Sequence, residues 1–389
     1  MSALRPLLAA FAAVVSMTVP SAVPAQAAAE TGGTPRLDHV FVIVLENEGA
    51  AQTFSADGPR YLATRLPSMG AFVPGYHAVG HLSLGNYLAM ISGQAPNPAT
   101  QADCPFFSDF LPGTPAAGGQ VTGSGCVYPA SVPTIADQLE AKGLRWRGYM
   151  EDMAAGAPGE PTACRHPAIG AVDGSQRAEP GDQYATRHDP FVYFHSIIDD
   201  GASCERHVVD YSQLRADLKR PATTPAYSFI SPNLCHDGHD EPCVDGAPGG
   251  LVSAGRFLSR AVPAILHSPA FDRRSLLVVT FDEAEAAGSE ADSSACCGQL
   301  PGPNTANPGF LYPGPGGGRT GAVLVSPCIE PGTLTRRAYN HYSLLRSIED
   351  GFGLDHLGYA AQPGLRPFGR DVFTGRGCTR KPRDAAPGR

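Results

Sequence analysis

Acidic, amide and imidazole side chains follow three segments that have the pattern of buried strands. The first segment, 38–47, is the apolar run DHVFVIVLEN, which ends in Glu46 and Asn47. The segment 226–231 runs into SPNLCHDGHD, and the segment 275–282 runs into TFDEAE. These two stretches supply the other polar side chains of the group: His236, Asp237, His239, Asp240, Asp282 and Glu283. Because ligands of an open α/β sheet bind beyond the carboxyl ends of its strands, we expect these side chains to share one site.

The oxygen-bearing side chains of this group predict one divalent metal ion. Glu46, Asn47, Asp282 and Glu283 offer hard oxygen ligands, which suit Mg, Ca or Mn, whereas nearby imidazoles would admit Zn or Fe. The simpler interpretation of Glu46 and Asn47 is that they cap a turn, and a lone histidine is more often packed or exposed than a ligand. The identity of the metal is therefore open.

Ser83 and Asn86 stand where a predicted helix begins, in the stretch GHLSLGNYLAMISG. Ser83 occupies the expected N-cap position, and its simplest role is to cap that helix. A helix N-terminus also favours an anion such as phosphate. Against a metal ion, the Ser83 hydroxyl would be an activated nucleophile and a metal ligand, and the Asn86 amide could donate to a phosphoryl oxygen.

Runs rich in Val, Ile and Phe alternate with helix-like segments along the chain, which predicts an α/β fold. We expect a mainly parallel central sheet with helices on both faces, interrupted by loop insertions stapled by disulfides. The other expected strands are 144–150 and 321–326. The expected helices are 83–91, 132–142, 211–219, 250–266 and 339–352, and the expected insertions are 94–129, 152–186 and 284–318.

The two ends of the chain and its cysteines indicate an exported protein. Residues 1–27 read as a signal peptide, because an apolar run is followed by Ala25-Gln26-Ala27. We expect one domain, 28–375, and a disordered basic tail, 376–389. The ten cysteines predict up to five disulfides, with Cys296 and Cys297 bonded to different partners because a bridge between neighbours is strained.

Charge and hydropathy exclude two classes of partner. The net charge of −8 becomes −9 once Arg5 leaves with the signal peptide, since 28 basic residues then face 37 acidic ones. Nucleic acid is therefore not an expected partner. No later window reaches the roughly 18 apolar residues that a transmembrane helix needs, so we expect a secreted protein. The sequence gives no expectation about its oligomeric state.

Five motifs, in this order, resemble the bacterial phosphoesterase family of secreted acid phosphatases and phospholipases C, in the alkaline phosphatase superfamily. They are VIVLEN, HLSLGNYLAMISG, SPNLCHDGHD, TFDEAE and NHYSLLRSIEDGFGL, and the resemblance extends over about 37–354. It implies Ser83 as the nucleophile and a metal ion held by residues matching Glu46, Asn47, Ser83, Asp282 and Glu283. It also implies phosphate contacts from residues matching Asn86, His188, His239 and His341, to which we add His236 and Asp237 from the second strand end.

The resemblance breaks at two positions beside the serine. The family has prolines where this chain has Leu82 and Gly85, so we expect a relaxed turn that leaves Ser83 and Asn86 in place. The loss should affect rate more than reaction type.

The expected function is a metal-dependent phosphoric ester hydrolase that acts through a phosphoserine. We favour an acid phosphatase acting on phosphoinositides or other lipid or small-molecule phosphates, with His239 or His341 protonating the leaving oxygen. The alternatives are a phosphodiesterase of phospholipase C type, a Ser-His-Asp acyl hydrolase and a non-catalytic binding protein. The acyl hydrolase would need a GxSxG motif, and His81 stands where its first glycine belongs.

Overall fold

The computed structural model describes residues 33–309 and 312–375, and these fall into one compact unit. The predicted signal peptide, 1–27, and the predicted tail, 376–389, lie outside the described residues, and the domain limits of 28 and 375 stay a prediction. Within the described ranges, no helix combines the length and the apolar run that crossing a bilayer would require.

An eight-stranded sheet forms the centre of the fold, in the order β13-β2-β12-β11-β1-β10-β7-β9. The central strand β1 (His39–Leu45) pairs in parallel with β10 and with β11. Parallel pairing continues from β10 through β7 to β9. On the other side β12 runs antiparallel to β11, and β2 runs antiparallel to β12. The bounds are β2 Ala71–Val73, β7 Trp146–Met150, β9 Val208–Asp210, β10 Tyr227–Ser231, β11 Ser275–Phe281, β12 Ala322–Val325 and β13 Thr333–Leu334.

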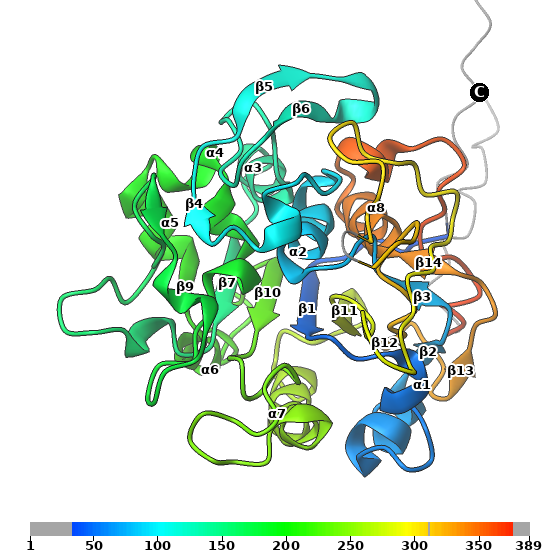
Figure 1. Ribbon diagram of the computed structural model, residues 1–389. Coiled ribbons are helices and arrows are strands. Elements are labelled where there is room, and N and C mark those ends of the chain that lie inside the picture. The colour runs from blue at the N-terminus through cyan, green and yellow to red at the C-terminus, as the bar shows by residue number, and fades with distance from the viewer. Residues whose placement is uncertain (1–32, 310–311, 376–389) are drawn as a thin grey trace, which may run out of the picture. The chain divides into compact units, whose positions relative to one another are not determined.

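Helices cover both faces of this sheet, as the alternating pattern predicts (Figure 1). Val40, Val42 and Val44 of β1 face a core cluster that contains apolar residues of α2, α3 and α8. The intervening residues Phe41, Ile43 and Leu45 face a second cluster that contains residues of α7. Successive strand side chains point to opposite faces, so a strand apolar at every position must be covered on both. The bounds are α2 Ser83–Ser92, α3 Ile135–Ala141, α7 Gly250–Leu266 and α8 His341–Phe352.

Three of the expected helices are shorter in the structure. The expected helix 339–352 begins at His341, because Tyr339–Asn340 is a short strand. Helix α3 begins at Ile135 rather than at 132, because Thr134 and Asp137 form a capping box at its N-terminus. The expected helix 211–219 is a 3-10 turn, Tyr211–Gln213, followed by the four residues of α6, Leu214–Asp217. The other short helices are α1 Ala50–Thr53, α4 His195–Ile198 and α5 Gly201–His207, and the 3-10 turn η7, Thr186–His188, contributes to the site described below.

Small sheets and disulfides occur both inside and outside the expected insertions. Three two-stranded sheets pair β3 (Tyr76–His77) with β14 (Tyr339–Asn340), β4 (Phe106–Phe107) with β8 (Ala171–Val172), and β5 (Leu111–Pro115) with β6 (Val121–Ser124). Cys104 is bonded to Cys126, Cys164 to Cys204 and Cys235 to Cys243. Cys328 is disulfide-bonded as well, and no cysteine of the described residues is free.

The expectation that Cys296 and Cys297 bond to different partners is wrong, because they are bonded to each other. In extended backbone, neighbouring side chains point to opposite sides. Cys297 instead has a φ of +66°, so the chain turns here and both sulfur atoms can meet.

Candidate active site

The three strand ends singled out in the sequence lie next to one another. Strands β11, β1 and β10 are neighbours and run parallel, so their carboxyl ends meet at one edge of the sheet. Backbone hydrogen bonds join the segments beyond them: Glu46 N–H donates to Asp237 O at 2.9 Å, and Asp282 N–H donates to Leu45 O at 2.8 Å. Asn47 N–H donates to the Asp282 carboxylate at 3.0 Å. Glu46, Asn47, Asp237 and Asp282 therefore meet at one edge of the sheet.

Glu46 is the centre of this site and is fully buried. Its Oε2 accepts a hydrogen bond from Ser83 Oγ at 2.7 Å, and its Oε1 accepts one from the Tyr87 hydroxyl at 2.6 Å. His188 lies between two carboxylates, with Nε2 at 3.2 Å from Glu46 Oε1 and Nδ1 at 3.2 Å from Asp237 Oδ2. The His188 ring also stacks on Tyr87. Glu46, His188 and Asp237 each offer a ligand atom within 4.8 Å of the other two.

Burial disfavours the charged form of the four carboxyl groups at this edge. Burial, with the charges of Asp282 and Asp237, raises the pKa of Glu46 well above its usual value. Burial also raises the pKa of Asp237 to about 7 and that of Asp282 to about 6. The pKa of Glu283 is raised by burial and then by Asp282. A bound cation would relieve the repulsion among these groups.

Several buried ligand atoms in this cluster lack a hydrogen-bond partner among the described residues. They are Asp237 Oδ2, Asp282 Oδ2 and both ring nitrogens of His188, whose contacts with the carboxylates are close but not aligned for hydrogen bonding. Burial, helped by the charge of Arg187, lowers the pKa of His188, so its ring is neutral and can offer a lone pair. Unpaired buried polar atoms are costly, and a donor set of carboxylates and neutral imidazole suits a divalent cation. The residues present therefore fit the predicted metal ion.

The predicted metal ligands do not all lie in this cluster. Glu46 and Asp282 do, and the Ser83 hydroxyl contacts both carboxylates. Asn47 contacts Asp282 through its main chain. Glu283 turns toward the loop before α2, where it pairs with the buried His81 ring. His188 and Asp237, which were predicted to contact substrate, each place a possible metal-ligand atom within 4.8 Å of one on Glu46.

The expectation that Ser83 caps helix α2 is wrong by one residue. Leu82 is the N-cap, with a φ of +70° and a ψ of 136°, and Ser83 is the first helical residue. Proline is restricted to a φ near −65°, so this turn is not a relaxed version of a proline turn but a different backbone conformation. At Gly85, an added Cβ would lie 3.0 Å from the Pro96 ring, so the missing side chain lets Pro96 pack against α2.

Asn86 holds the turn before the helix together. Its Oδ1 accepts hydrogen bonds from the N–H groups of Val79 and Gly80 at 2.9 and 3.1 Å. Its Nδ2 donates to the carbonyl oxygens of Gly80 and Leu82 at 2.8 and 3.2 Å. Both amide hydrogens are therefore engaged within the chain. This geometry does not support the predicted donation to a phosphoryl oxygen and makes Asn86 a positioning residue for Ser83.

The carboxylate of Asp103 occupies the helix N-terminus at which we expected phosphate. Its Oδ1 accepts a hydrogen bond from Leu84 N–H at 2.9 Å, and the carboxylate also accepts one from Ser83 N–H. The other oxygen, Oδ2, lies 4.0 Å from Arg187 Nε. The N–H groups of Ser83 and Leu84 are thus bonded within the protein, and Asp103 occupies the position at this terminus that was predicted for phosphate.

The predicted site histidines His239 and His341 have different surroundings. His239 Nδ1 donates to Asp240 at 2.7 Å, and Nε2 accepts from Arg187 at 3.3 Å. Although burial lowers the pKa of His239, Asp240 and Asp237 outweigh it and raise the pKa. His341 is fully buried, with Nε2 donating to Asp282 O at 2.6 Å and Nδ1 accepting from Tyr76 at 3.1 Å. Burial lowers the pKa of His341 to about 4.

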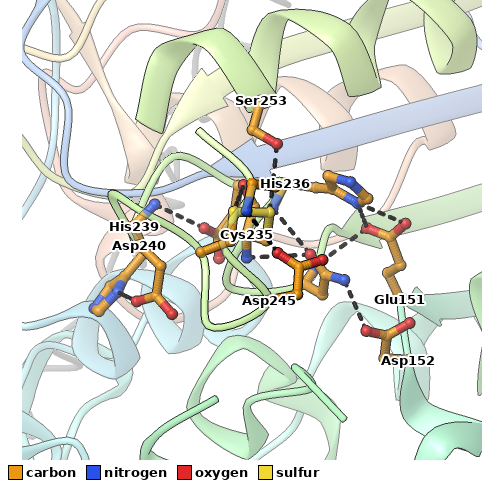
Figure 2. Close-up of a disulfide and its surroundings, with 12 residues drawn as sticks. Glu151, Asp152, Cys235, His236, His239, Asp240, Asp245 and Ser253 are labelled. Carbon is orange, nitrogen blue, oxygen red and sulfur yellow. Dashed lines mark hydrogen bonds and ion pairs between the residues drawn. A yellow bond between two sulfur atoms is a disulfide. The ribbon is translucent and has the colours of Figure 1, made fainter. Parts of the chain in front are cut away.

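His236 does not face the candidate site. Its Nδ1 lies 2.9 Å from both oxygens of Glu151, which follows β7. Figure 2 shows the His236 ring directed toward Glu151, whereas His239 and its partner Asp240 lie on the other side of the loop that carries Cys235. The prediction that His236 contacts substrate is therefore not supported, because the loop turns between these two histidines.

Comparison with known proteins places the chain in a family. The sequence model of the Phosphoesterase family matches residues 60–355. The chain belongs to the Phosphoesterase family. It is 27% identical over 299 residues to a phosphate-repressible acid phosphatase of Penicillium chrysogenum, covering 76% of this chain and 55% of that protein. It is 24% identical over 326 residues to a phosphatidylinositol-3-phosphatase of Mycobacterium tuberculosis, covering 84% of this chain and 80% of that protein.

The similarity has limits in length and in structure. This Phosphoesterase family chain spans about half the length of the fungal acid phosphatases it matches. A solved alkaline phosphatase superfamily protein from Vibrio parahaemolyticus superposes with a TM-score of 0.47 at 12% identity, covering 88% of this chain and 74% of that one. That likeness is too remote to carry a conclusion about chemistry.

Four residues at the site of this Phosphoesterase family chain were not predicted from the sequence: His81, Tyr87, Asp103 and Arg187. Tyr87 lies one helical turn after Ser83, so the i, i+4 spacing could have pointed to it. Arg187 precedes His188 directly, and His81 stands two residues before Ser83. Asp103 gave no signal, because it lies in an insertion without periodicity.

Proposed function

We propose that this chain is a metal-dependent phosphomonoesterase, an acid phosphatase that acts through a phosphoserine on Ser83. The observation that carries the proposal is the Ser83 hydroxyl, 2.7 Å from Glu46, in a cluster of buried carboxylates in which Asp237 Oδ2 and Asp282 Oδ2 have no hydrogen-bond partner among the described residues. Names of relatives, acid phosphatase and phosphatidylinositol-3-phosphatase, support the monoester specificity and admit phosphoinositides among the substrates.

Glu46, His188, Asp237 and Asp282 would hold the divalent metal ion. When bound there, the ion would stabilise the deprotonated serine and offset charge on the phosphoryl oxygens. Metal analysis of the purified chain would distinguish among Mg, Ca, Mn, Zn and Fe. We also propose that the protein acts outside the cytoplasm, since its disulfides persist in oxidising compartments.

The residues of the chain account for each proton and bond in the proposed reaction. Ser83 Oγ attacks phosphorus while its proton passes to Glu46 Oε2, its hydrogen-bond acceptor. The bond from phosphorus to the leaving oxygen breaks, and that oxygen takes the Nε2 proton of His239. His239 enters this step protonated on both ring nitrogens, as its raised pKa favours, and its Nε2 then no longer accepts from Arg187. Water then attacks the phosphoserine and gives a proton to His239, and Ser83 regains its proton from Glu46. The products are an alcohol and phosphate, and both side chains return to their starting states.

The test is hydrolysis of p-nitrophenyl phosphate by the purified chain with added metal ion. We expect Ser83→Ala to reduce kcat by at least about 1,000-fold, as loss of a nucleophile requires. Ser92→Ala is the matched control, because Ser92 is buried in the same helix and, among the described residues, its hydroxyl contacts only main-chain groups, Leu88 O at 2.7 Å and Gln94 N–H at 3.2 Å. Undiminished hydrolysis by Ser83→Ala would rule out the serine mechanism.

A second substrate separates monoesterase from diesterase activity. The phosphodiester p-nitrophenylphosphorylcholine should be hydrolysed far more slowly than the monoester. Preference for the diester would instead identify a phospholipase C type of activity at the same site.

A further inference from the structure

Arg187 is a buried cation beside the candidate nucleophile that the proposed reaction leaves without a role. It lies in the 3-10 turn η7 next to His188, and only 4% of its surface is exposed. Its Nη1 donates to Gln176 O at 3.2 Å, and its Nη2 donates to His239 Nε2 at 3.3 Å. The guanidinium therefore adjoins the residue that we propose as the acid.

The guanidinium of Arg187 has hydrogen-bonding capacity to spare. Arginine carries five N–H donors, and Gln176 and His239 are its hydrogen-bond acceptors among the described residues. The nearest carboxylate, that of Asp103, lies 4.0 Å from Nε, beyond hydrogen-bonding distance. Burial of a charged group is costly when its partners do not compensate it.

A second buried arginine shows what full pairing looks like in this chain. Arg165 is 7% exposed and forms a bidentate pair with Asp182, with N–O distances of 2.9 and 2.8 Å. It also lies over the Tyr184 ring, 4.5 Å from the centroid. Burial in this chain therefore does not prevent a full carboxylate pair, and Arg187 lacks such a pair among the described residues.

Asp103 cannot complete the pairing of Arg187 from its present position. Its carboxylate is held by the N–H groups of Ser83 and Leu84, and its φ of +55° and the bonded Cys104 fix the backbone at that point. Because Asp103 also fills the N-terminus of α2, that terminus is not open to a phosphate group. Arg187, by contrast, keeps N–H donors that have no hydrogen-bond acceptor among the described residues.

We propose that Arg187 binds the phosphoryl oxygens of the substrate, with Asp103 as the residue that positions it. The planar guanidinium suits two oxygens of one phosphate, and its contact with His239 places the bound phosphoryl group beside the acid that serves the leaving oxygen. The inference rests on the proposed function, since it assumes a phosphate ester substrate.

The experiment compares arginine variants in the full, metal-loaded chain, with inorganic phosphate as the probe. We expect Arg187→Gln to raise the inhibition constant of phosphate about 10- to 100-fold, the range for a lost charged hydrogen bond. Arg187→Lys keeps the positive charge but loses the planar, bidentate guanidinium, so it should raise the inhibition constant of phosphate by less. Arg165→Gln and Arg165→Lys are matched controls for loss of a buried arginine and should change the constant less than about twofold among correctly folded variants.

Direct binding distinguishes this inference from the proposed function. Calorimetric titration of phosphate into Ser83→Ala and into Ser83→Ala with Arg187→Lys requires no turnover, and we expect weaker binding in the double variant. Equal binding in both would overturn the role of Arg187. If the Arg187 variants changed kcat but not the inhibition constant of phosphate, the proposal would also be overturned, because Arg187 would then only support His239. Absent hydrolysis in the unmutated chain, with phosphate binding still dependent on Arg187, would contradict the proposed function alone.

Discussion

The surroundings of a histidine decide whether it can release a proton in the pH range of a reaction. Both ring nitrogens of His341 are held within the protein, and burial lowers its pKa to about 4. The His239 ring is about one third exposed, and Asp240 and Asp237 raise its pKa against the effect of burial. Of the two acids that the sequence left open, the structure favours His239. His341 then serves to hold the segment of Asp282 in place.

A pair of substrates with different leaving groups tests this assignment at the residue scale. In His239→Gln, kcat/KM for an alkyl monoester such as glycerol 2-phosphate should fall about 100- to 10,000-fold, the usual contribution of a general acid. The loss for p-nitrophenyl phosphate should be much smaller, because nitrophenolate leaves without a proton. His341→Gln should lower both rates alike, together with the melting temperature. Equal losses for the two substrates in His239→Gln would exclude it as the acid.

At the scale of elements, strand ends were predictable and loop contributions were not. The continuous apolar runs and their polar ends located Glu46, Asp237 and Asp282, because side chains that follow parallel neighbouring strands must meet at one edge. The antiparallel direction of β12 could not be predicted, because a buried strand is apolar at every position whichever way it runs. The occupant of the α2 N-terminus could not be foreseen either, since Asp103 comes from an insertion whose path depends on a disulfide. Likewise, the turn between His236 and His239 is set by contacts with Glu151 and Asp240 rather than by periodicity.

Two disulfides, Cys104–Cys126 and Cys164–Cys204, should allow effects on stability to be separated from effects on activity. The Cys104–Cys126 and Cys164–Cys204 bridges span 22 and 40 residues, so chain entropy alone gives each about 3 to 4 kcal/mol of stability. Asp103 directly precedes Cys104, whereas Cys164 and Cys204 have no contact with Ser83 or Arg187 among those described. We expect both double alanine variants to melt earlier in thermal unfolding.

Only the Cys104→Ala and Cys126→Ala pair should also lower kcat/KM. We expect a decrease of about 10-fold, which corresponds to the net free energy of one hydrogen bond made by Asp103. The assay must be run well below both melting temperatures. If the Cys164→Ala and Cys204→Ala pair lost activity equally, the effect would be general destabilisation instead of a displaced Asp103.

At the scale of the whole molecule, the carboxyl cluster makes stability depend on both pH and metal. In the unfolded chain Asp and Glu release their protons near pH 4, whereas Asp237 and Asp282 in the metal-free fold release theirs near pH 7 and 6. Below about pH 4 both states are protonated, and these groups have no effect. As the pH rises toward 7 the unfolded state loses its protons first, so these groups lower the free energy of unfolding by a few kcal/mol.

A divalent cation should reverse this loss, because it binds the deprotonated carboxylates and stabilises only the folded chain. We expect the melting temperature of the metal-free protein to fall between pH 5 and pH 8, and the increase on adding metal ion to be larger at pH 8. Asp237→Asn removes one of the buried charges, so it should make the metal-free fall shallower and the metal-induced increase smaller. Thermal unfolding at pH 5 and at pH 8, with and without chelator, gives the four melting temperatures that are needed for each protein. An increase in Asp237→Asn as large as in the unmutated chain would show that the metal ion binds elsewhere, since the cluster could then not be its site.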